Sequence, residues 1–224
     1  MRGKGLWVRV WDAPVRLFHW GVVALVFTSW LTQHEGWMRA HEIAGYTMFA
    51  ALLFRFAWGV AGSDTARFRS FLASPMAAFA HLRRFARREP DREIGHNAAG
   101  GWMVLVLLAL LALQVGTGLC ANDQIETYGP LSERVGQDWS DWLSQIHAAN
   151  FVAIEVAVLL HVAAVFAYML LKGQNLIRPM VTGRKRLPAD TRAPRMRSPM
   201  LALAILAVSG GIVAAVVLWG SGGV

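Results

Sequence analysis

Five long apolar stretches constrain this chain more than any other feature. They cover about residues 15–33, 41–62, 97–120, 147–171 and 199–220. An α-helix needs about 20 mainly apolar residues to cross the hydrocarbon core of a bilayer, and each stretch is close to that length. With 55% hydrophobic residues, the 224-residue chain is also too apolar for a soluble domain of its size. We therefore expect an all-α integral membrane protein.

Charge alternates between the segments that flank and join these stretches. Segments 1–16, 63–96 and 172–198 are rich in Lys and Arg, whereas loop 34–40 is nearly neutral and loop 121–146 is acidic. In membrane proteins the cytoplasmic loops carry the excess of Lys and Arg. The pattern predicts a membrane protein with a cytoplasmic N-terminus, five crossings and a C-terminus on the outer side. It also explains the net charge of +8 without nucleic acid as a partner.

The connecting segments differ in composition. Loop 63–96 mixes arginine with Phe and Leu, so it is either a short amphipathic helix on the cytoplasmic surface or a loop whose charges set the topology. Loop 121–146 is polar and contains Trp, and we expect it to cap the outer face, where a partner would dock. Residues 184–199 form a basic, proline-containing linker. The fifth stretch lacks ionisable residues and is expected to lie outside the chemistry of the other four. The residues before the first stretch show no cleavage site, so no cleaved signal peptide is expected.

Four histidines lie within the apolar stretches or at their ends: His19, His41, His147 and His161. Polar side chains inside a bilayer are costly and indicate function. Fourteen residues separate His147 from His161, which places both on one helix face, about 21 Å apart along the axis. The topology puts His41 level with His147 near the outer surface. It pairs His19 with His161 toward the cytoplasm, a looser match because His161 lies about two turns from the cytoplasmic end of its stretch.

Two imidazoles on facing helices of a bundle are the usual axial ligands of a b-type haem. The spacing therefore predicts two stacked haem b groups, one held by His41 and His147 and the other by His19 and His161. No C-x-x-C-H motif for covalent haem attachment is present, and the single cysteine, Cys120, can form no internal disulfide.

Several neighbouring residues have more than one interpretation. Gly45, one turn after His41, leaves room for a flat macrocycle, although small residues also allow plain helix packing. Arg55 either binds a propionate of the inner haem or extends to the cytoplasmic headgroups. Glu155 is either a protonated structural residue or part of a proton path.

Of the other three histidines, His34 and His96 are the alternative haem ligands that the sequence offers. His34 lies in the short outer loop, where hydration explains it. His96, at the cytoplasmic end of the third stretch, is a candidate neighbour of a haem ligand. His81 lies among arginines, and we expect it to be solvated.

The chain resembles the bacterial cytochrome b561 family, in the branch typified by the b-type cytochrome subunit of nickel–iron hydrogenases. The motifs that carry the resemblance are VWDAPVRLFHW at 10–20, HEIAGY at 41–46, RFAWGVAGSDTARF at 55–68, GHNAAGGWMV at 95–104, TGLCANDQ at 117–124 and NLIRPMVTGRK at 175–185. The resemblance covers about residues 8–187 and implies a four-helix core with two haems b in the bacterial inner membrane, with the C-terminus in the periplasm. It implies axial ligands at His19, His41, His147 and His161. Ala98, where family members often have proline, and Glu155 depart from the pattern.

These features predict a dihaem domain over residues 1–187, followed by a linker and fifth transmembrane helix over 188–224. Because both axial positions are filled by protein, such iron passes single electrons and offers no open site for a substrate. We expect a respiratory electron-transfer subunit, rather than a self-sufficient enzyme, working between membrane quinone and a periplasmic c-type cytochrome, hydrogenase or other oxidoreductase. The alternatives are a stand-alone quinone-dependent oxidoreductase acting on superoxide or ferric ion, and a haem-free scaffold or transporter. Assembly into a homo-oligomer is compatible with all of these.

Overall fold

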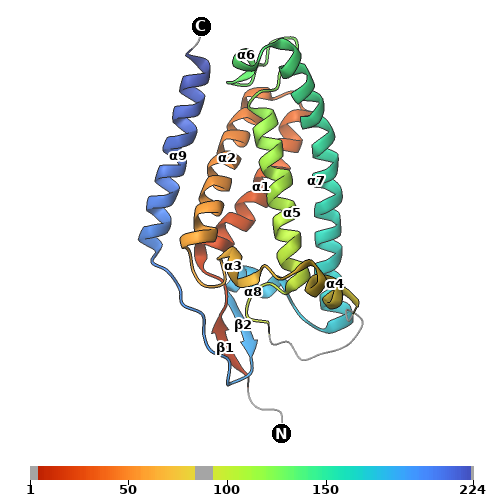
Figure 1. The fold of residues 1–224 in the computed structure, drawn as a ribbon, viewed down its shortest axis with the longest axis vertical. Coiled ribbons are helices and arrows are strands. Elements are labelled where there is room, and N and C mark those ends of the chain that lie inside the picture. Colours follow the sequence, from red (N-terminus) through yellow and green to blue (C-terminus); the bar gives the residue numbers. More distant parts are fainter. Residues whose placement is uncertain (1–4, 84–92, 223–224) are drawn as a thin grey trace. The chain divides into compact units, whose positions relative to one another are not determined.

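The computed structural model describes residues 5–83 and 93–222 and confirms the all-α membrane architecture. Five of its helices are long and apolar enough to cross a membrane (Figure 1): α1 (Ala13–His34), α2 (Met38–Ala61), α5 (Ala98–Gly118), α7 (Gln137–Lys172) and α9 (Pro199–Ser221). The chain is therefore a multi-pass membrane protein.

Short elements connect the long helices. They are β1 (Leu6–Arg9), α3 (Phe68–Phe71), α4 (Pro75–Arg83), α6 (Ser132–Val135), α8 (Ile177–Thr182) and β2 (Arg184–Leu187). Strands β1 and β2 pair antiparallel, with Leu6 opposite Leu187 and Arg9 opposite Arg184. The sequence did not predict this sheet, whose strands have only four residues each and are about 180 residues apart in the chain.

The chain divides into two compact units. The first contains residues 1–17, 56–106 and 157–202, and the second contains 18–55, 107–156 and 203–224. Each of the five long helices contributes one end to each unit, and successive helices run in alternate senses. The basic connections fall in the first unit and the acidic connection between α5 and α7 falls in the second, as the alternating charge predicts.

Four of the five predicted spans match the observed helices to within three residues, but the fourth begins ten residues earlier than predicted. Helix α7 starts at Gln137, so residues 137–146 extend the helix instead of belonging to the cap. This first part is polar, and hydropathy alone cannot detect it. Two of its serines bond the preceding loop: Ser140 Oγ donates to the carbonyl of Cys120, and Ser144 Oγ accepts from the backbone N–H of Asn122.

Asp12 organises the core of the first unit. One carboxylate oxygen accepts from the backbone N–H of Val15 at 2.8 Å and caps α1. The other accepts from the indole N–H of Trp58 at 3.0 Å. Trp58 is fully buried and Asp12 is 6% exposed. This bond ties the start of α1 to the end of α2.

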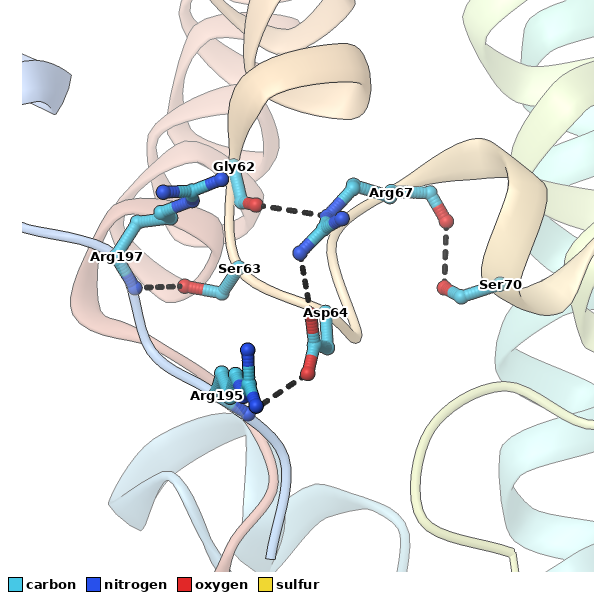
Figure 2. A network of polar contacts seen from close by, with 7 residues as sticks. All are labelled: Gly62, Ser63, Asp64, Arg67, Ser70, Arg195 and Arg197. Atoms are coloured by element: carbon cyan, nitrogen blue, oxygen red, sulfur yellow. Dashed lines mark hydrogen bonds and ion pairs between the residues drawn. The ribbon is translucent and has the colours of Figure 1, made fainter.

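The linker before α9 is also fixed in the first unit. Figure 2 shows the backbone N–H groups of Arg195 and Arg197 donating to the side chains of Asp64 and Ser63, at 2.9 and 3.0 Å. Asp64 also pairs with Arg67. The linker follows a defined path here because both its donors have partners on the turn that ends α2.

The loop predicted over 63–96 contains a helix, although residues 84–92 lie outside the described part. In α4 the exposed apolar residues are Met76, Phe79 and Leu82, which recur every three residues on one face. This spacing favours the amphipathic interpretation over a loop that only sets topology. His81, expected to be solvated, instead has its Nε2 2.7 Å from the hydroxyl of Tyr168.

Candidate functional site

Two of the predicted ligands face each other in the second unit. His41 is in the first turn of α2, and His147 is in α7. Their ring centres are 6.2 Å apart and their planes are inclined by 78°. Both rings line a cavity of about 370 Å³. The structure therefore brings together the outer pair that the spacing predicted.

Hydrogen bonds fix the orientation of both imidazoles. His41 Nδ1 is 2.9 Å from the carbonyl oxygen of Ser29, and His147 Nδ1 is 2.9 Å from the carbonyl oxygen of Gln114. A carbonyl only accepts, so this network assigns the proton to Nδ1 and the lone pair to Nε2, which at His147 accepts from the Gln114 amide in this structure. A histidine that binds a metal commonly donates its other ring N–H to such a carbonyl. Both side chains are thus in the tautomer that suits coordination through Nε2.

A polar network on α5 and α7 surrounds His147. Asn150, which is buried, donates through Nδ2 to the carbonyl of Leu110 at 2.9 Å and to Oε1 of Gln114 at 2.7 Å. The Gln114 amide nitrogen lies 3.1 Å from His147 Nε2, and Thr117 Oγ1 lies 3.2 Å from Nδ1. Sequence reasoning missed these residues. The signal that could have found them is the presence of Gln and Asn within otherwise apolar helices.

Two glycines shape the cavity in different ways. A Cβ added at Gly118 would lie 2.8 Å from His147 Cε1, so only glycine allows the ring its present position. Gly45 lines the cavity, and a Cβ there would meet nothing within 4 Å. A side chain would therefore fit at residue 45, and both interpretations of Gly45, room for a flat ligand and plain helix packing, stay predictions.

The donor set fits a haem iron. A metal–imidazole bond is about 2 Å long, so two imidazoles on opposite sides of one metal have ring centres roughly 6 Å apart. The observed separation is 6.2 Å. Among the described residues, no three His, Cys, Asp or Glu side chains form a metal-binding group. Two protein ligands suit an iron whose remaining ligands belong to a macrocycle.

The outer loop closes over the same cavity. Asp123, Thr127, Gly129 and Pro130 contribute to its lining. The Asp123 carboxylate accepts from the backbone N–H groups of Ile125, Glu126 and Thr127 at 2.8–3.0 Å. These bonds, that of Ile125 first, lower the pKa of Asp123 from 3.8 to about 2. The loop is therefore held as a compact turn by one ionised side chain.

The second predicted pair stays a prediction. His19 belongs to the second unit and His161 to the first. Arg55 is only 3% exposed, which favours an internal anionic partner over extension to the headgroups. Glu155, whose role the sequence left open, is exposed on α7.

The other two histidines have aromatic neighbours. His34 is exposed and stacks on Trp30, with ring centres 5.9 Å apart and planes inclined by 7°. His96 lies between Trp11 and Phe71, with its ring centre 4.7 Å from each.

Comparisons with known proteins identify the family of the chain. The chain is 24% identical over 213 residues to a protein of Cupriavidus necator named a probable Ni/Fe-hydrogenase B-type cytochrome subunit, and the alignment covers 78% of this chain and 85% of that protein. No solved structure matches. The family model described as prokaryotic cytochrome b561 matches residues 10–183, which is most of the chain. The chain therefore belongs to the prokaryotic cytochrome b561 family, whose members are membrane b-type cytochromes that bind haem b.

Proposed function

We propose that this chain is a dihaem electron-transfer subunit that exchanges electrons between membrane quinone and a redox protein on the periplasmic side. The observation that carries the proposal is the His41–His147 pair, with ring centres 6.2 Å apart beside a cavity and both Nδ1 atoms bonded to carbonyls. Haem b with two axial imidazoles supplies reversible one-electron transfer. The protein's part is to hold the two imidazoles, fix their tautomers and enclose the group.

The inner haem would be held by His19 and His161. His161 follows His147 by fourteen residues within one continuous helix, α7, so the two lie about 21 Å apart along its axis. This spacing supports two cofactors in sequence across the bilayer. The buried guanidinium of Arg55, fourteen residues after His41 on α2, would offset the charge of a haem propionate.

An acidic surface in the second unit supports the periplasmic partner. The loop between α5 and α7 and the first turns of α7 carry Asp123, Glu126, Glu133, Asp138 and Asp141, with Arg134 as the single basic residue. Trp139 and Trp142 are exposed beside them. A basic face on a redox protein would be steered to this surface, and the exposed aromatic rings would add contact area. The name of the Cupriavidus necator relative makes a hydrogenase one candidate.

Haem counting on histidine variants tests the proposal. We expect the purified protein to contain two haems b per chain by the pyridine haemochrome assay. His41→Ala and His147→Ala should each remove the outer haem, and His19→Ala and His161→Ala should each remove the inner one. His34→Ala is the matched control, because His34 is an exposed histidine that stacks on Trp30. One haem in the unaltered protein, or two in the His147→Ala protein, would refute the assignment.

Purification from native membranes separates an electron-transfer subunit from a stand-alone enzyme. A subunit should co-purify with a periplasmic oxidoreductase, and neutralising Asp138 and Asp141 together should release it while both haems remain. Quinone-dependent turnover of superoxide or ferric ion by the isolated chain would instead support the enzyme alternative.

A further inference from the structure

A second cavity lies in the first unit, and none of the four predicted haem ligands lines it. Its volume is about 880 Å³. Three segments next to the ends of membrane helices form its wall: residues 64–71 follow α2, residues 93–96 precede α5, and residues 192–197 precede α9. Because these helices enter or leave the bilayer here, the cavity lies near the level of the lipid headgroups.

Arginine dominates the charge of this cavity. The described residues of its wall include four arginines and two acids: Arg67, Arg192, Arg195, Arg197, Asp64 and Glu93. Arg67 pairs with Asp64 and also donates to the carbonyl of Gly62, so the charges of Arg67 and Asp64 offset each other. Three arginines and one carboxylate then remain, which leaves the cavity with an excess of positive charge.

The three remaining arginines belong to the linker before α9, whose backbone is held in place. The backbone N–H of Arg195 donates to Asp64 and that of Arg197 donates to Ser63 (Figure 2). The side chains of Arg192, Arg195 and Arg197 are exposed, and their guanidinium groups have no hydrogen bond or ion pair with the residues that the structure describes. The linker is therefore fixed while its charged groups stay available to a ligand.

We propose that this cavity binds the phosphate headgroup of an anionic membrane lipid, with the guanidinium groups of Arg192, Arg195 and Arg197 as donors. A guanidinium presents paired N–H groups that match two oxygens of a phosphate. Clusters of basic residues next to membrane helices attract anionic lipids. Phe71 and Met196 add apolar surface to the wall, which suits the glycerol and the first acyl carbons of a lipid.

Membrane topology alone does not account for this arrangement. An excess of arginine on one side of a membrane sets the orientation wherever the side chains lie within the connecting segments. The linker arginines instead share one cavity with the residues after α2 and before α5. Arg9, Arg69 and Arg184 are also exposed in the first unit but do not line the cavity, so they form a matched set of controls.

Lipid titration of the purified, haem-loaded protein tests the site. The probe is a fluorescent short-chain phosphatidylglycerol in a neutral detergent, followed by fluorescence anisotropy. The combined variant Arg192→Gln, Arg195→Gln and Arg197→Gln should weaken binding by about ten- to a hundredfold, and each single substitution by about fivefold. The haem spectrum of each variant reports its folding, and the single variants keep the test valid where the combined variant does not fold.

The control variant removes the same charge from outside the cavity. The combination of Arg9→Gln, Arg69→Gln and Arg184→Gln should weaken binding by less than about threefold, because exposed charges away from the ligand are screened. Equal weakening in the two combined variants would overturn the proposal, since binding would then depend on total charge and not on the cavity. Unchanged binding in the variants of the linker arginines would also overturn it.

Two further titrations identify the ligand. Phosphatidylcholine carries a phosphate but no net charge and should bind more weakly than phosphatidylglycerol. Inorganic phosphate lacks the apolar part and should not displace phosphatidylglycerol at an equal concentration. Displacement under that condition would overturn the assignment to a lipid and would favour a site for free phosphate. The proposal depends neither on the number of haems nor on the redox partner, so it can fail while the proposed function stands.

Discussion

Replacing Gly118 by alanine tests whether His147 carries a haem. A Cβ at residue 118 would lie 2.8 Å from His147 Cε1 and 3.2 Å from Nδ1. Carbon atoms in ordinary contact are about 3.5–4.0 Å apart, so the imidazole would have to move by roughly 0.7 Å. The ring is tied to the carbonyl of Gln114 by a 2.9 Å hydrogen bond, and the same movement would stretch that bond.

The free-energy cost of this clash should weaken haem binding. Adding a methyl group to a filled site costs about 1–3 kcal/mol, which corresponds to roughly 5- to 150-fold weaker binding when the strained group is a ligand. In Gly118→Ala we expect the outer haem to be lost or its reduction potential to change, while the inner haem remains. The pyridine haemochrome assay gives the number of haems, and a redox titration of the α-band gives both potentials.

Gly116→Ala provides the control. Gly116 is on the same helix, and a Cβ there would meet nothing within 4 Å. Both variants gain the same helix propensity, so a difference between them reflects the contact with His147. Two haems with unchanged potentials in Gly118→Ala would refute the reasoning, as would an equal loss in Gly116→Ala.

Three further predictions concern the surroundings of the site. Asp12→Ala removes the α1 cap and the carboxylate that accepts from the buried indole N–H of Trp58. The free energy of unfolding, measured by thermal unfolding, should therefore fall by about 2–4 kcal/mol. Combining Trp58→Phe with Asp12→Ala should recover part of this loss. Arg134→Ala removes the hydrogen bond to the Trp219 carbonyl and the 4.0 Å cation–π contact with the Trp219 ring. Amide hydrogen exchange of residues 129–135 should therefore become faster. Arg134→Lys should have a smaller effect. The folded pKa of Asp123 is lowered to about 2, so its ionised form stabilises the turn fully above about pH 4, and this stabilisation is lost as the pH falls toward 2. The protection factors for hydrogen exchange of the amides of residues 125–127 should therefore fall over that pH range, and Asp123→Ala should make them low and independent of pH there.

Hydropathy was sufficient to locate the membrane helices because length and apolar composition are what a bilayer selects. It failed at the start of α7, where the residues are polar. There the helix continues because Ser140 and Ser144 bond the loop at Cys120 and Asn122. Those partners are about 20 residues away in sequence, and no local pattern indicates them.

The sheet and the fixed path of the linker were missed for the same reason, because both depend on contacts between residues that are distant in sequence. Strands β1 and β2 pair through backbone groups, so their side chains show no periodic signal. The linker's path depends on Asp64 accepting from the backbone of Arg195, more than a hundred residues later. A composition rich in Arg and Pro is typical of an extended linker, and the sequence does not indicate where such a linker is held by tertiary contacts.

The pairing of His41 with His147 was predictable from the sequence, but the residues that orient the two rings were not. His41 and His147 could be paired because helix direction and residue spacing determine depth in a membrane. The orientation of each ring depends on which helix lies opposite the imidazole and on the rotation of that helix about its axis. The carbonyl of Ser29 and the Cβ position of Gly118 therefore became visible only with coordinates.

Helix α9 has a closer relation to the site than its composition suggested. The family match ends at residue 183, before this helix begins. Yet Arg134 in the cap bonds Trp219, and a Cβ at Gly220 would lie 2.2 Å from the carbonyl oxygen of Pro130. Pro130 lines the cavity beside His41 and His147. Because α9 packs so closely against Pro130, the C-terminal helix supports the loop that supplies this lining residue, although no residue of α9 lines the cavity or is a predicted ligand.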